Sequence, residues 1–90
     1  MPKYVIEREI PGVGTMSAAE FRQVARKSVG VLNEVGAGIQ WAHKYVTGDK
    51  LYCVHLAEDI ELIREHARIG RFPANSISEI KTIIDPITAE

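Results

Sequence analysis

The spacing of hydrophobic residues changes along the chain, and each spacing predicts a different element. Residues 3–10 are rich in Tyr, Val and Ile and predict a first strand. The apolar residues that follow recur at helical spacing and predict a helix over residues 17–35. Ser17 and Glu20 at its start form a capping-box pair, because each side chain can bond the other residue's backbone N–H. The apolar face of this helix is expected to carry Phe21, Val24, Ala25, Ser28, Val31, Leu32 and Val35.

A hairpin is predicted in the middle of the chain, with strands over residues 39–47 and 50–56. The two residues between them, Gly48 and Asp49, favour a type II′ turn because glycine comes first. This register places residue 47 opposite 50 and residue 41 opposite 56. One face of the hairpin would then carry Trp41, His43, Tyr45, Tyr52, Val54 and Leu56. The other face would carry Gln40, Ala42, Lys44, Val46, Leu51, Cys53 and His55.

The rest of the chain predicts a second helix over residues 58–69 and a last strand over residues 77–84, followed by a loose tail. The element order is therefore β-α-β-β-α-β, which is typical of the α+β ferredoxin-like fold in a single domain of residues 1–90. In this fold a four-stranded antiparallel sheet carries both helices on one face. The other face has no helix to cover it, so we expect a sheet-to-sheet homodimer.

Composition excludes several classes of protein. The chain of 90 residues is 46% hydrophobic and 26% charged, which is ordinary for a folded domain, and its net charge is −1 without a basic patch. A nucleic-acid partner is therefore not expected. No apolar run approaches the roughly 18 residues of a membrane span, and the first residues lack the pattern of a signal peptide. Cys53 is the only cysteine, so a reducing cytoplasm is the expected compartment.

The candidate chemistry centres on three histidines. Cys53 and His55 are two residues apart on a predicted strand, so they share a face and could bind zinc or nickel; alternatively, Cys53 is a small buried hydrophobe. His66 is either a boundary residue near a helix end or a base or ligand in a pocket between helix and sheet. Glu7 on the first strand is the expected partner of His66, unless the Glu7 carboxylate is solvated or paired with an arginine. His43 completes the set of candidate metal ligands.

The aromatic residues allow two interpretations. Tyr4, Trp41, Tyr45 and Phe72 could wall a ligand pocket near His66, as in dimeric ferredoxin-like monooxygenases and isomerases, or they could pack in the core or in a dimer interface. This enzyme-like hypothesis rests on analogy of fold. The sequence contains no recognisable nucleophile–base–acid triad and no phosphate-binding loop, so it predicts no particular catalytic activity. A plain interaction module is the third alternative.

Several segments resemble a small bacterial family of unknown function whose members are often described as nickel-binding proteins. They are residues 4–12, Trp41 with Tyr45 and Val46, residues 50–54, and residues 65–68 with 72–75. The resemblance covers nearly the whole chain. It implies a ferredoxin-like fold and a homodimer, and one member of the family is described as binding Ni²⁺ at the dimer surface, with a role in sequestration or detoxification. His43, His55 and His66 are then the candidate nickel ligands, with Cys53 and Glu7 as further candidates.

Overall fold

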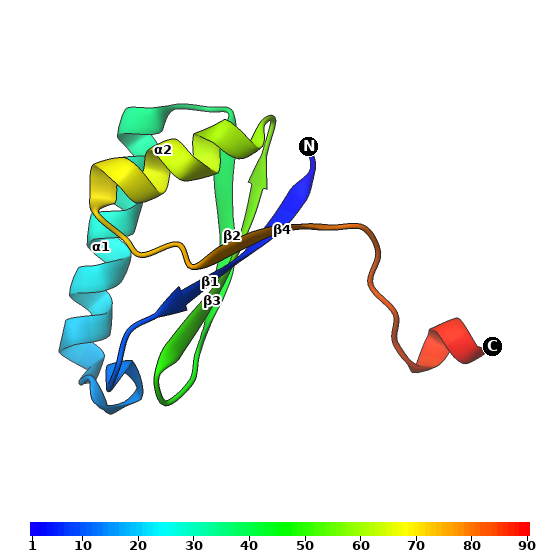
Figure 1. Cartoon of the computed structure of the whole chain (residues 1–90), viewed down its shortest axis with the longest axis horizontal. Helices are drawn as coiled ribbons and strands as arrows, with labels where there is room; N and C mark the ends of the chain where they lie inside the picture. Colours follow the sequence, from blue (N-terminus) through cyan, green and yellow to red (C-terminus); the bar gives the residue numbers. More distant parts are fainter.

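Four strands form one antiparallel sheet in the order β2-β3-β1-β4, in a computed structural model that describes all 90 residues. The strands are β1 (Lys3–Glu9), β2 (Ile39–Val46), β3 (Lys50–Ala57) and β4 (Ser76–Ile80), and the helices are α1 (Ala18–Val35) and α2 (Ile60–Gly70). Short 3-10 turns span Val13–Thr15 and Pro86–Ala89. Both helices pack on the same side of the sheet (Figure 1). This confirms the α+β architecture, with a strand order compatible with the ferredoxin-like fold.

The predicted capping box of α1 is confirmed, whereas α2 begins at Ile60, two residues later than predicted, because Asp59 is its cap. Ser17 accepts a hydrogen bond from the backbone N–H of Glu20 at 3.1 Å, and the Glu20 carboxylate accepts one from the N–H of Ser17 at 3.0 Å. Asp59 caps α2 by accepting from the N–H of Glu61 at 2.8 Å. Arg71 ends α2 in the left-handed conformation at φ 56°, so the chain turns back toward the sheet.

The hairpin is confirmed near its turn and wrong at its far end. Thr47 donates to the carbonyl of Lys50, and Tyr45 lies opposite Tyr52 as predicted. A β-bulge then inserts one extra residue between Trp41 and His43, so that Trp41 faces His55 instead of Leu56. Because side chains alternate along a strand, the bulge moves Trp41 to the helix-covered face of the sheet.

Two smaller predictions also need correction. Gly48 does not have the positive φ that a type II′ turn requires, so the turn type was wrong although its two-residue length was right. The last strand was predicted over residues 77–84, but β4 ends at Ile80. Ile80 pairs with Lys3, the first residue of β1, so the residues after it have no neighbouring strand with which to bond.

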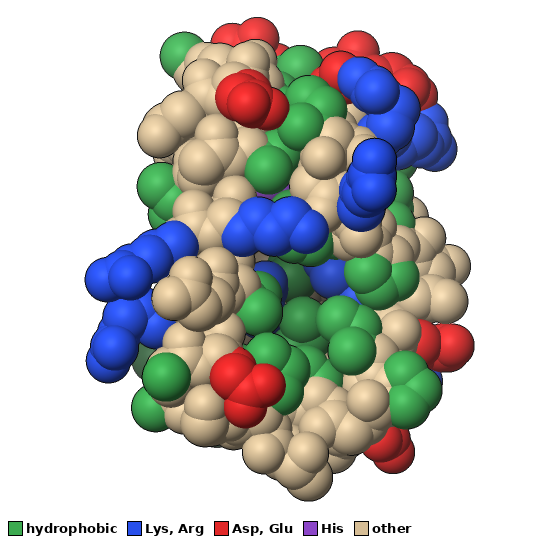
Figure 2. Space-filling view, turned by 90° about the vertical axis from the view of Figure 1, so that its left-hand side faces the viewer, with side chains coloured by type: hydrophobic (Ala, Val, Ile, Leu, Met, Phe, Trp, Pro, Cys, Tyr) green, Lys and Arg blue, Asp and Glu red, His purple; other side chains and the backbone are tan.

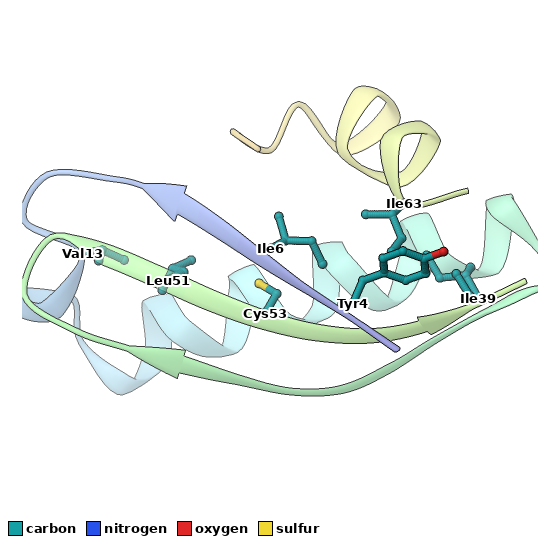
Figure 3. Packing of buried hydrophobic residues seen from close by; sticks show 8 residues of the cluster. Tyr4, Ile6, Val13, Ile39, Leu51, Cys53 and Ile63 are labelled. Carbon is teal, nitrogen blue, oxygen red and sulfur yellow. The ribbon is translucent and has the colours of Figure 1, made fainter. Parts of the chain in front are cut away.

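The hydrophobic core lies between the sheet and the two helices (Figure 3). Ile6 and Cys53 from neighbouring strands are fully buried there, together with Ile63 from α2. Val13 closes the end of the core nearest the hairpin turn (Figure 3). There the loop after β1 is tied to the turn by bonds from Gly12 to the Asp49 carboxylate and from Ile10 to the Asp49 carbonyl, both at 2.9 Å.

The second face of the sheet, called the open face below, carries no helix (Figure 1). Its residues include Val5, Glu7, His43, Tyr45, Tyr52, Val54 and Leu56. The chain after β4 runs away from the body of the molecule on this side, and three of its isoleucines, Ile83, Ile84 and Ile87, are exposed (Figure 1). Neither helix has the length and the apolar character that crossing a membrane would need.

Candidate functional site

The five candidate metal ligands lie on two different faces of the sheet. Cys53, His55 and His66 are buried between the sheet and the helices. His43 and Glu7 lie on the open face, where Glu7 pairs with Lys50 at 2.7 Å. The predicted proximity of Glu7 to His66 was therefore wrong, because odd-numbered residues of β1 point away from the helices.

His55 of β3 and His66 of α2 meet between the sheet and the helices. Their ring centroids are 5.2 Å apart, and each residue is only 1% exposed. The Ser28 hydroxyl of α1 lies 3.3 Å from Nε2 of His66, and the Phe72 ring packs beside the same imidazole at 5.2 Å. Neither ring nitrogen of His55 has a protein hydrogen-bond partner, and Nδ1 of His66 also has none.

Burial keeps both imidazoles neutral. Removal from water, together with the nearby His66 and the charges of Arg8 and Lys44, lowers the pKa of His55 from 6.5 to about 3. Burial also lowers the pKa of His66 to about 4, with the Arg8 charge as the second cause. At neutral pH, the pair is therefore uncharged, and two positive side chains, Arg8 and Lys44, lie near enough to act on both imidazoles.

Arg8 and Lys44 are the positive groups in this region. Arg8 is 2% exposed; its Nε donates to Sγ of Cys53 at 3.3 Å, and its Nη1 donates to the carbonyl of Pro73 at 2.6 Å. Burial lowers the pKa of Lys44, whose Nζ lies 5.4 Å from the ring centroid of Trp41. None of the ion pairs of the chain includes Arg8 or Lys44.

This interior does not fit a nickel ion. No group of three or more His, Cys, Asp or Glu side chains is placed to hold one metal, in the interior or elsewhere in the chain. A divalent cation beside His55 and His66 would also be repelled by the positive charges of Arg8 and Lys44, and no carboxylate there would offset this repulsion. The two imidazoles are suitable ligands by type, but their surroundings oppose a cation.

A cavity of about 370 Å³ lies next to this region, between α1 and the sheet. Nine of its ten lining residues are hydrophobic, and Lys44 is the exception. The lining residues are Ile10, Val13, Met16, Phe21, Val24, Ala25, Trp41, Lys44, Val46 and Leu51. On the helix-bearing side of the molecule, hydrophobic side chains gather around a hollow, and Lys or Arg side chains lie at its edge (Figure 2).

Of the four aromatic residues predicted as pocket walls, Trp41 lines this cavity. Tyr4 is buried in the core, Phe72 packs against His66, and Tyr45 is exposed on the open face. The sequence reasoning missed Arg8 and Lys44. The signal for Arg8 was a charged residue at an inward position of β1, in alternation with Tyr4 and Ile6.

The open face offers a different set of groups. His43 is exposed, and its ring lies 5.0 Å from the ring of Tyr45 in an edge-on arrangement. It is the only histidine that solvent reaches, since His55 and His66 are buried.

Comparisons with known proteins identify the family. The model of a family described as nickel responsive protein SCO4226-like matches residues 4–80. The crystal structure of SCO4226 from Streptomyces coelicolor A3(2) superposes with a TM-score of 0.72 at 14% sequence identity, over 91% of this chain and 99% of that one. At this identity, the structural likeness shows the fold. No curated protein matches the chain. Because the family model covers most of the chain, the protein belongs to the family of SCO4226-like nickel responsive proteins.

Proposed function

We propose that the protein is a dimeric nickel-binding protein that sequesters the metal on the open face of its sheet, with His43 as the imidazole ligand. One observation carries this proposal: His43 is the only exposed histidine of a chain whose family is named for its response to nickel. Imidazole nitrogen is a favoured ligand of nickel in proteins. The positive charges beside the interior histidines argue against a cation there.

A second copy of the chain supplies the ligands that one copy lacks. One open face presents one imidazole, with the Glu7 carboxylate as the further candidate once it leaves Lys50. Two open faces packed together would bring two imidazoles and two carboxylates to one interface. The exposed Tyr45 and the exposed isoleucines after β4, which lie on the same side, favour a second copy as the occupant of this face.

Calorimetric titration of tag-free protein with Ni²⁺ tests the proposal. We expect saturable binding with a dissociation constant below about 100 µM, which corresponds to roughly −5.5 kcal/mol. The variant His43→Gln should lose most of this binding, because it removes the only accessible imidazole.

The matched control is His66→Gln, which removes a buried imidazole of the same chemistry. It should bind nickel as the unchanged protein does, provided that circular dichroism shows it folded. Loss of binding in this variant alone would place the metal in the interior and overturn the assignment of His43. Absence of binding in the unchanged protein would refute nickel binding altogether.

A further inference from the structure

We infer that the cavity between α1 and the sheet is a binding site for a small organic anion with an apolar body, such as a medium-chain carboxylic acid. This site is separate from the proposed nickel site, which lies on the other face of the sheet.

The walls of the cavity determine the body of the ligand. Nine hydrophobic residues from α1, the loop after β1 and the hairpin strands surround it. Its volume of about 370 Å³ lies in the lower part of the range of roughly 300–1,000 Å³ that small-molecule sites occupy. A short alkyl chain or a compact aromatic group therefore fits, whereas a peptide or a nucleotide does not.

The polar groups of the cavity determine the head of the ligand. Lys44 has no ion-pair partner, although it is half-buried in an otherwise apolar lining. The β-bulge places the Trp41 indole in the cavity lining, with its ring centroid 5.4 Å from Nζ of Lys44. Lys44 is the only charged residue of the lining, and its ammonium group is complementary to a carboxylate, which supplies both the negative charge and the acceptor atoms.

The charge of the surroundings also selects an anion. Arg8 is buried close enough to act on Lys44, and its bonds go to a thiol and a carbonyl. A buried cation without a counter-ion is costly, so a negative head group beside Lys44 would offset that cost, and the nearby charge of Arg8 adds to the attraction. A cationic or neutral ligand of the same shape would provide no such compensation.

Trp41 fluorescence can report binding directly, because Trp41 is the only tryptophan and lines the cavity. The probes are decanoate, decanol and decylamine, which share an alkyl chain and differ in charge. We expect saturable quenching or a spectral shift with decanoate, and at least about tenfold weaker binding of decanol, which is a difference of about 1.4 kcal/mol. Decylamine should bind no more tightly than decanol.

Variants locate the site. Lys44→Met should weaken decanoate binding to the level of decanol and leave decanol unchanged, whereas Lys81→Met, which removes an exposed lysine far from the cavity lining, should change neither. Ala25→Phe should fill the cavity and abolish binding of both probes. Equal binding of decanoate and decanol, or equal behaviour of the two lysine variants, would overturn the inference, as would absence of saturable binding.

Discussion

The buried histidines show how strongly one residue's surroundings set its chemistry. His55 and His66 have the same side chain as His43, yet burial keeps the first two neutral inside the molecule. The sequence placed Cys53 and His55 on one face of a strand correctly, because alternation along a strand is regular there. It also placed Lys44 on that face, but it could not show that Arg8 of β1 would share the surroundings of the two histidines, since long-range packing decides which charges meet.

The two buried, neutral histidines make the free energy of unfolding depend on pH. Both pKa values are lowered on folding, so the unfolded chain binds protons that the folded chain does not bind. The stability that the two neutral imidazoles supply is therefore fully present above pH 6.5, and it is lost as the pH falls toward about 4 for His66 and about 3 for His55. We expect the free energy of unfolding, measured by urea titration, to fall by up to about 1.4 kcal/mol per pH unit for each histidine between pH 6.5 and 5.

Substitutions separate this effect from general acid sensitivity. His66→Gln should flatten the dependence, because one of the two titrating groups is gone. Asn33→Gln, which changes an exposed position of α1 and no titrating group, should keep the pH dependence of the unchanged protein. Parallel curves for all three proteins would show that the buried pair does not control the acid response.

At the scale of elements, the spacing of polar and apolar residues predicted the order and type of every major helix and strand. The β-bulge at Ala42 was missed because both registers give the hairpin plausible faces: Trp41 is an acceptable residue on either side of a sheet. The two registers are distinguished only by how the hairpin packs against α1 around the cavity, and that packing depends on residues distant in the sequence. The early end of β4 was missed for a related reason, since a strand needs a neighbour to bond with.

The junction between the loop after β1 and the hairpin turn should be sensitive to a single methyl group. A Cβ atom at Gly14 would lie 2.6 Å from the carbonyl oxygen of Thr47 and 2.9 Å from Cα of Gly48, so the backbone would have to shift. We expect Gly14→Ala to lower the free energy of unfolding by about 1–3 kcal/mol in urea titrations.

Gly30 in α1 provides the matched comparison. A Cβ atom there would meet nothing within 4 Å, and alanine is the better helix former. Gly30→Ala should therefore raise the free energy of unfolding by about 0.5–1 kcal/mol. An equal effect of the two substitutions would contradict the close approach at Gly14.

At the scale of the whole molecule, the sheet is covered on one side and open on the other (Figure 1). We expect light scattering to give a mass of twice the 10.0 kDa of one chain, because a second copy would cover the open face. Tyr45→Arg should shift the protein toward the monomer without unfolding it, since Tyr45 is 61% exposed in the single chain and lies outside the core.

Val29→Arg is the control for that measurement, because Val29 is an exposed hydrophobic residue on α1, which packs on the other side of the sheet. This variant should keep the mass of the dimer. A monomeric unchanged protein, or loss of the dimer in both variants, would argue against pairing through the open face.

The buried thiol of Cys53 has a practical consequence. It is the only cysteine, it is completely inaccessible, and Arg8 donates a hydrogen bond to its sulfur. A thiol reagent can reach it only when the layer between the sheet and the helices opens, so the rate of alkylation measures that opening without any added label. The chain thus contains its own kinetic probe, and a compound that holds α1 against the sheet should slow the reaction of Cys53.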